Sequence, residues 1–133
     1  MVIVDTNILA YLLIESDRTK EARALFAKDS DWRSEAFLLV EFSNVLTTYR
    51  RIGALSGHQT ESLLAEAARR VRELLSVPNL QALRCAGRFA VSAYDARFLA
   101  VADTLGVKLV TEDAKLRAAA PALTRSIAQA LVA

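Results

Sequence analysis

The sequence has few cysteines, prolines and glycines, and no long hydrophobic run. Its 133 residues include one cysteine, two prolines and four glycines. The single Cys85 excludes an internal disulfide framework and is typical of a reducing compartment. The longest unbroken apolar run, ILAYLLI (8–14), is far shorter than the ~20 residues that a membrane-spanning helix needs. We therefore expect a soluble protein without disulfides.

A secretory signal, a strong charge bias and a regular aromatic pattern are also lacking. The first basic side chain is Arg18, so the basic segment that opens a signal peptide is missing and a cytoplasmic protein is expected. The net charge of +2 indicates no particular partner. The aromatic residues show no spacing that predicts a platform for stacking bases. What the chain does have is 53% hydrophobic residues, enough for a single domain, residues 1–133, with one core.

Short apolar stretches alternate with helical patterns along the chain. We expect strands at 2–4 and 107–110, shorter strands at 31–34, between 76 and 91 and at 123–127, and helices at 8–14, 19–28, 36–51, 59–75, 96–106 and 114–120, with another helix before 91 and a brief terminal one. This alternation indicates an α/β fold with a parallel sheet covered on both faces. In such sheets ligands bind beyond the carboxyl ends of the strands, so residues that follow strands are candidate site residues.

Three aspartates fall at the predicted ends of elements. Asp5 follows the first strand directly, Asp113 follows the strand VKLV by two residues, and Asp95 opens the helix before that strand. We expect all three at one edge of the sheet. Each also has a purely structural explanation, because Asp5 and Asp113 are good helix N-caps and Ser92 with Asp95 has the spacing of a capping box.

A fourth acid, Glu41, is the only charged residue in FLLVEFSNVL (37–46). If this segment is helical, its apolar arc centres on Phe42, Val45, Leu46 and Tyr49. Glu41 then forms a polar column with Asn44 and Thr48 along the edge of that arc. We therefore expect Glu41 at the margin of the core, where a helix borders a cleft. The simpler alternative is a carboxylate that reaches into solvent.

Capping explains neither the shared edge nor Glu41. Carboxylates brought together repel one another, and burying even one costs several kcal/mol. A cluster of four is favourable mainly when cations neutralise it, and hard ions such as Mg²⁺ prefer oxygen ligands and are commonly shared with substrate phosphates. Two such ions about 4 Å apart would activate a water and stabilise the leaving oxygen during phosphodiester cleavage.

The remaining charge favours a polyanionic substrate. Removing the four acids from 15 leaves 11 against 17 Lys and Arg, so the rest of the chain carries +6. The basic residues group at 50–51, 69–72 and 84–88. Each group, taken singly, is better explained as the solvated face of a helix.

Several stretches resemble the PIN-domain ribonucleases, most closely the VapC toxins of VapBC toxin–antitoxin pairs. They are IVDTNIL (3–9), VEFSNVL (40–46), SAYDARFLAVADTLGVKLVTED (92–113) and the following AKL, and they occur in the family's order and at its separations. The resemblance implies a three-layer α/β/α fold with a central parallel sheet and an endoribonuclease that uses one or two Mg²⁺ or Mn²⁺ ions. It assigns metal binding and catalysis to Asp5, Glu41, Asp95 and Asp113.

The resemblance also implies supporting residues and partners. Thr6, Asn7 and Thr111 align with polar residues that orient the acids, and we expect the same of Asn44, which follows Glu41 on the polar column. The implied partners are an RNA substrate, for which a structured RNA such as tRNA is one candidate, a VapB-like antitoxin and a second copy of the chain. His58 and Cys85 have no counterpart in the motifs.

Two other interpretations stay open. The chain is alternatively a module that binds RNA or a protein without cutting, although the complete set of four acids argues against this. A phosphatase with an aspartyl nucleophile is disfavoured, because D-T-N after the first strand lacks the D-x-D of such enzymes. A Walker-A phosphate loop is absent.

Overall fold

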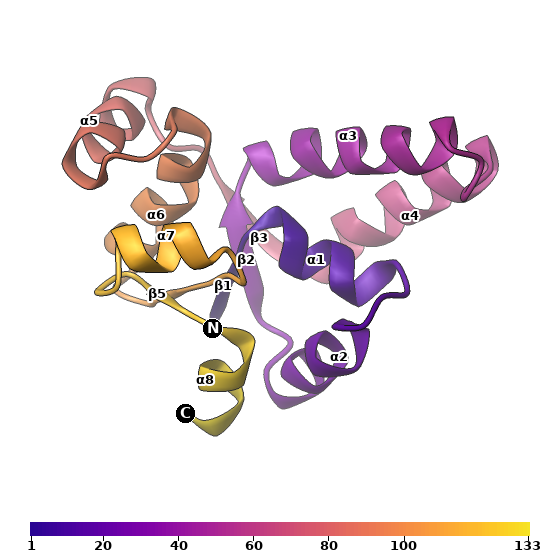
Figure 1. Ribbon diagram of the computed structural model, residues 1–133, viewed down its shortest axis with the longest axis horizontal. Coiled ribbons are helices and arrows are strands. Elements are labelled where there is room, and N and C mark those ends of the chain that lie inside the picture. Colours follow the sequence, from indigo (N-terminus) through magenta and orange to yellow (C-terminus); the bar gives the residue numbers. More distant parts are fainter.

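The computed structural model describes residues 1–133 as one sheet wrapped by helices (Figure 1). The strands are β1 (Val2–Val4), β2 (Trp32–Glu35), β3 (Val71–Leu75), β4 (Leu109–Val110) and β5 (Thr124–Arg125). The helices are α1 (Thr6–Leu13), α2 (Thr19–Lys28), α3 (Phe37–Arg51), α4 (Gly57–Arg70), α5 (Asn79–Phe89), α6 (Ala93–Leu105), α7 (Ala114–Ala119) and α8 (Ile127–Val132). All strand pairs are parallel, in the order β3-β2-β1-β4-β5. None of the helices combines the length and the apolar character that crossing a bilayer requires.

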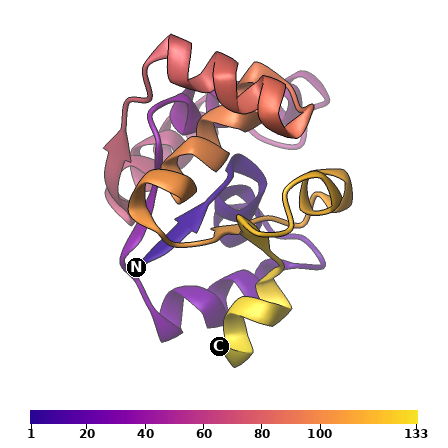
Figure 2. The same cartoon turned by 90° about the vertical axis from the view of Figure 1, so that its left-hand side faces the viewer.

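Alternate side chains of the central strand β1 enter two separate cores. Ile3 belongs to a larger core that also takes residues from α3, α5, α6 and α7, whereas Val2 and Val4 belong to a smaller core with residues of α2 and α8. Helix α1 contributes to both cores. Figure 2 shows α5 and α6 on one side of the sheet and α2 and α8 on the other. The predicted three-layer α/β/α arrangement around a parallel sheet is confirmed.

The order of the strands brings the ends of β1 and β4 together. Val4 and Val110 are paired in register, and the backbone N–H of Asp5 donates to the carbonyl of Val110. From β1 the chain goes to β2 and then β3 on one side, and only after these two strands does it return to β4 on the other side of β1. The direction of winding therefore changes at β1. Open α/β sheets form their ligand crevice at such a point. The residues after β1 and β4 therefore meet at this crevice.

The helix expected over 59–75 is wrong in its last part. Helix α4 ends at Arg70, and Val71–Leu75 forms β3 at the edge of the sheet. The sequence VRELL suits a helix or a strand, and pairing with β2, for example Ser34 with Leu74, selects the strand. The strand expected between 76 and 91 accordingly lies earlier in the chain, and the strand expected over 107–110 is shorter, Leu109–Val110.

Candidate active site

A single cavity of about 420 Å³ is lined by all four predicted acids, Asp5, Glu41, Asp95 and Asp113. It lies where β1 and β4 end, with α3 and α6 contributing its other walls. The elements that supply the acids are far apart in the sequence and adjacent in the fold. The structure thus brings Glu41 together with the three aspartates that were expected at one edge of the sheet.

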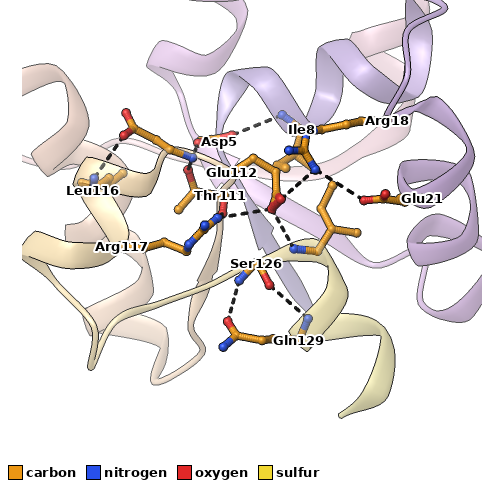
Figure 3. A network of polar contacts seen from close by, with 12 residues as sticks. Asp5, Ile8, Arg18, Glu21, Thr111, Glu112, Leu116, Arg117, Ser126 and Gln129 are labelled. Carbon is orange, nitrogen blue, oxygen red and sulfur yellow. Dashed lines mark hydrogen bonds and ion pairs between the residues drawn. The ribbon is translucent and has the colours of Figure 1, made fainter.

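Asp5 is held at both carboxylate oxygens. Its Oδ1 accepts a hydrogen bond of 3.2 Å from the backbone N–H of Ile8, as expected of the N-cap of α1, and its Oδ2 accepts one from the Thr111 hydroxyl (Figure 3). Thr111 is fully buried directly after β4, and its Oγ1 also accepts from the N–H of Asp113. The segments after β1 and β4 are joined through these bonds, which fix the orientation of Asp5.

Glu41 lies at the border of α3 between core and cavity. Leu38, Phe42 and Leu46 of the same helix are buried in the larger core. Glu41 is half-buried, and its Oε1 accepts a hydrogen bond of 2.6 Å from the hydroxyl of Thr6. The expected position at the core margin is therefore observed, and the alternative of a freely solvated carboxylate is not.

Asp95 and Asp113 complete the ring of acids from two helix N-termini. The Ser92 hydroxyl caps α6 by accepting from the N–H of Asp95 at 3.0 Å, but Asp95 makes no reciprocal bond, so the capping box is only half formed. Asp113 caps α7, as expected, because its Oδ1 accepts from the N–H groups of Lys115 and Leu116. Asp113 also lines the cavity, and its Oδ2 accepts no hydrogen bond.

The negative charges of the four carboxylates are not neutralised by any basic side chain. The pKa of Asp5 is raised to about 6, chiefly by burial. The hydrogen bonds from Thr111 and Ile8 act to lower this pKa, and the charges of Asp95 and Glu41 act to raise it. Burial, followed by the charge of Asp113, also raises the pKa of Asp95. None of the four acids forms an ion pair with a lysine or arginine. Their mutual repulsion favours the binding of a cation.

The donors suit a hard divalent cation in an open site. They are carboxylate, hydroxyl and amide oxygens, the ligands that Mg²⁺ and Mn²⁺ prefer. No three or more His, Cys, Asp or Glu side chains are arranged closely enough to hold a metal ion between them, so the acids do not form a closed cage. Mg²⁺ usually keeps several waters and uses only one or two carboxylates together with substrate phosphates. The residues present fit that mode of binding.

The four residues expected to support the acids divide into two pairs. Thr6 and Thr111 donate hydrogen bonds to Glu41 and Asp5. Asn7 and Asn44 line the cavity and are exposed, without a hydrogen bond to any of the four acids. No arginine or lysine lines the cavity. Of the basic groups in the sequence, Arg69 and Arg70 pair with Glu66 and Arg88 lies near Asp103, as expected of solvated helix faces.

Sequence reasoning missed a buried ion pair behind the cavity. Glu35, at the end of β2, accepts a hydrogen bond of 3.2 Å from the N–H of Phe37 and lies 3.6 Å from the guanidinium of Arg97. Arg97 also donates to the carbonyl of Val77 at 3.0 Å. These contacts tie the first turn of α3 to α6, the two helices that carry Glu41 and Asp95. No local pattern signals the pair, because its members belong to different elements.

A second missed group surrounds Glu112, which lies between Thr111 and Asp113. Its carboxylate accepts hydrogen bonds from Arg18 at 2.9 Å, from Arg117 at 3.3 Å and from the N–H of Ile127 at 3.2 Å (Figure 3). The partners belong to the segment before α2, to α7 and to α8. Glu112 therefore anchors the loop after β4 through residues that do not line the cavity.

Comparison with known proteins agrees with this architecture. The model of the PIN domain family matches residues 2–121. Ribonuclease VapC3 of Pyrobaculum aerophilum is 27% identical over 126 residues, which cover 91% of this chain and 95% of that protein. The crystal structure of PAE2754 from the same organism superposes with a TM-score of 0.80 at 21% identity, covering 98% of this chain and 92% of that one. Since the family model spans nearly the whole chain, the chain belongs to the PIN domain family.

Proposed function

We propose that this protein is a metal-dependent endoribonuclease that hydrolyses RNA phosphodiester bonds and acts as the toxin of a type II toxin–antitoxin pair. The observation that carries the proposal is the convergence of Asp5, Glu41, Asp95 and Asp113 on one cavity with no basic partner. Such a cluster of carboxylates destabilises the folded state, which favours a functional role over a structural one. The similarity to a protein named Ribonuclease VapC3 supports the same class of activity.

The four acids would hold one or two Mg²⁺ or Mn²⁺ ions. When bound, such an ion neutralises charge on the phosphate and lowers the pKa of a water. The protein's own contribution is orientation. The Thr111 hydroxyl and the N–H of Ile8 fix Asp5, and the Thr6 hydroxyl fixes Glu41, before substrate arrives.

Hydrolysis at this site adds water across one P–O bond of the RNA. The water oxygen joins phosphorus in line with the departing oxygen, one carboxylate takes the water's proton, and the leaving oxygen is protonated as the strand parts. We assign Asn7 and Asn44, which line the cavity with free amide groups, to positioning water or the sugar–phosphate backbone. The site contains neither histidine nor cysteine and uses neither in this chemistry.

The direct test is cleavage of a mixed RNA by the purified protein in Mg²⁺ and in EDTA. We expect fragments only in Mg²⁺, and none from Asp95→Asn. The far-UV circular dichroism of this variant should match the wild type, because the Ser92 hydroxyl caps α6 through the backbone N–H of residue 95. Metal-dependent cleavage retained by Asp95→Asn would refute the assignment of the site. RNA binding without cleavage in either buffer would make the chain a non-cleaving module.

The proposal includes the partners of such a toxin. We infer a single PIN domain over residues 1–133 that acts in the cytoplasm, forms a homodimer, cuts a structured RNA such as tRNA and is held inactive by a VapB-like antitoxin. Induced expression in a bacterial host should arrest growth, and Asp95→Asn should not. Co-expression of the cognate VapB-like antitoxin should relieve the arrest. Light scattering on the purified protein measures the dimer independently of activity.

A further inference from the structure

Two aromatic rings stack on the rim of the acidic cavity. The rings of Phe37 and Tyr94 lie with their centroids 5.3 Å apart and their planes at 12°. Phe37 is the first residue of α3, Tyr94 is the second residue of α6, and both line the same cavity as the four acids. No local pattern predicts this pair, because its members come from helices that are far apart along the chain.

The pair leaves a large apolar surface open next to the carboxylates. Tyr94 is 61% exposed although Phe37 lies against it, and Val40 on the same wall is 59% exposed. The cavity therefore has two chemically different parts, a cluster of acids and an aromatic wall. Tyr94 directly precedes Asp95, and Phe37 lies one helical turn before Glu41. A single nucleotide offers matching parts, a phosphate and a flat base.

The helix turns that carry the aromatic pair are connected by an ion pair between Glu35 and Arg97. Glu35 accepts a hydrogen bond from the N–H of Phe37 and is 2% exposed, and Arg97, one helical turn after Tyr94, lies 3.6 Å from it. These contacts fix the first turns of α3 and α6 relative to each other. A rigid platform binds a base at a smaller entropic cost than mobile rings would.

We propose that Tyr94, backed by Phe37, is the residue on which a base beside the scissile phosphate stacks, so that this side chain positions the RNA for cleavage. This inference rests on the proposed ribonuclease function and adds a residue that binds the substrate. Proteins that bind single-stranded nucleic acid stack bases on aromatic side chains.

The first experiment measures binding without cleavage. The probe is a short single-stranded oligouridine RNA with one central 2-aminopurine, titrated with the full-length protein in Ca²⁺ in place of Mg²⁺. We expect the fluorescence to be quenched on binding, and the Kd to rise about 5- to 150-fold in Tyr94→Ala, the effect typical of losing one stacked base. Tyr94→Phe should bind like the wild type. Leu83→Ala, which trims an exposed residue of α5 outside the cavity, is the matched control.

The second experiment places the stacked base relative to the cut. In Mg²⁺ an RNA cleaved by the wild type is compared with copies that carry an abasic site at each position in turn. We expect one position beside the cut at which loss of the base raises KM for the wild type and for Tyr94→Phe but has no further effect on Tyr94→Ala.

The outcomes separate this inference from the function on which it rests. If no RNA is cut in Mg²⁺ but 2-aminopurine is quenched and Tyr94→Ala abolishes the quenching, the nuclease proposal fails and the platform stands. Cleavage with an unchanged Kd and KM in Tyr94→Ala overturns the platform alone. If Tyr94→Ala changes the molecular mass in light scattering and leaves RNA affinity unchanged, the rings contact a protein and the platform is likewise overturned.

Discussion

The hydroxyl of Thr6 donates a hydrogen bond of 2.6 Å to Oε1 of Glu41, and so connects the residue after Asp5 to the second turn of α3. The two residues belong to α1 and α3, which are separate along the chain and pack against each other in the larger core. Thr6 is itself buried, so its hydroxyl has little freedom to turn elsewhere. This bond holds one carboxylate of the cluster at a fixed angle.

Replacing Thr6 by valine should impair catalysis while the fold is kept. Valine has nearly the same shape but lacks the hydroxyl, and losing a group that orients a metal-binding side chain typically costs about 10- to 100-fold in metal affinity or activity. The measurement is kcat/KM for RNA cleavage over a series of Mg²⁺ concentrations. Thr6→Ser, which keeps the hydroxyl, should stay close to the wild type. Equal losses in both variants would show that packing, and not the bond, is what matters.

Asp5→Asn should stabilise the metal-free protein above pH 6. The pKa of Asp5 is about 6 in the fold against 3.8 ordinarily, so the folded state holds this proton more tightly than the unfolded chain. The resulting stabilisation is complete below about pH 3.8 and disappears as the pH rises through 6. Asparagine remains uncharged, which makes the variant more stable by up to about 3 kcal/mol at neutral pH.

Urea unfolding in EDTA at pH 4 and pH 7 tests this pH dependence. The free energies of unfolding of wild type and Asp5→Asn should lie closer together at pH 4 than at pH 7. Asp29→Asn is a suitable control for the method, because the N-terminal amino group lowers the pKa of Asp29. Replacing this acid should therefore lower the free energy of unfolding at neutral pH, whereas Asp5→Asn should raise it. A wild type more stable than Asp5→Asn at neutral pH would contradict the burial of an unpaired charge.

Mg²⁺ should raise the Tm of the wild-type protein. A ligand that binds only the folded state adds about 2.7 kcal/mol when its concentration is one hundred times its Kd. The repulsion among Asp5, Asp95 and Asp113 is relieved at the same time. Differential scanning fluorimetry at rising Mg²⁺ measures the shift, and Asp95→Asn should show a smaller one. A Tm that does not depend on Mg²⁺ or Mn²⁺ would argue against a cation site.

Glu112→Gln should lower both stability and cleavage. Its side chain is 12% exposed and accepts from Arg18, Arg117 and the N–H of Ile127. The substitution removes the negative charge and replaces one acceptor oxygen by an NH₂ group that faces at least one of these donors. We expect a loss of about 1–3 kcal/mol in the free energy of unfolding. Cleavage should fall as well, because the flanking Thr111 and Asp113 lose their anchor.

The control for Glu112 belongs to the same network. Glu21 lies 3.7 Å from Arg18 and is 45% exposed (Figure 3), and exposed pairs of this kind contribute about 0–1 kcal/mol. Glu21→Gln should therefore change neither urea unfolding nor kcat/KM measurably. If Glu112→Gln is as mild as Glu21→Gln, the network does not position the loop after β4.

Local patterns in the sequence predicted the elements that carry the site. Apolar VIV before Asp5 and the cap at Asp113 depend on neighbouring residues alone, and both are observed. The helical periodicity around Glu41 placed it correctly at the core margin. The segment Val71–Leu75 was wrongly expected to be helical, because its structure depends on a distant part of the chain. It pairs with β2, which lies far away in the sequence. A strand whose apolar residues also suit a helix is chosen by its partner.

The sequence determined which residues have the chemistry for this site, because a carboxylate after a buried strand or at a helix cap is a matter of local order. The packing of α3 and α6 around the ends of β1 and β4 decided the rest. It determined which acids share one cavity, which acids a threonine orients, and that the ring of Tyr94 stacks on that of Phe37. Those contacts join residues distant along the chain. Their geometry follows from the order of the strands and the fit of the cores, which no stretch of sequence contains.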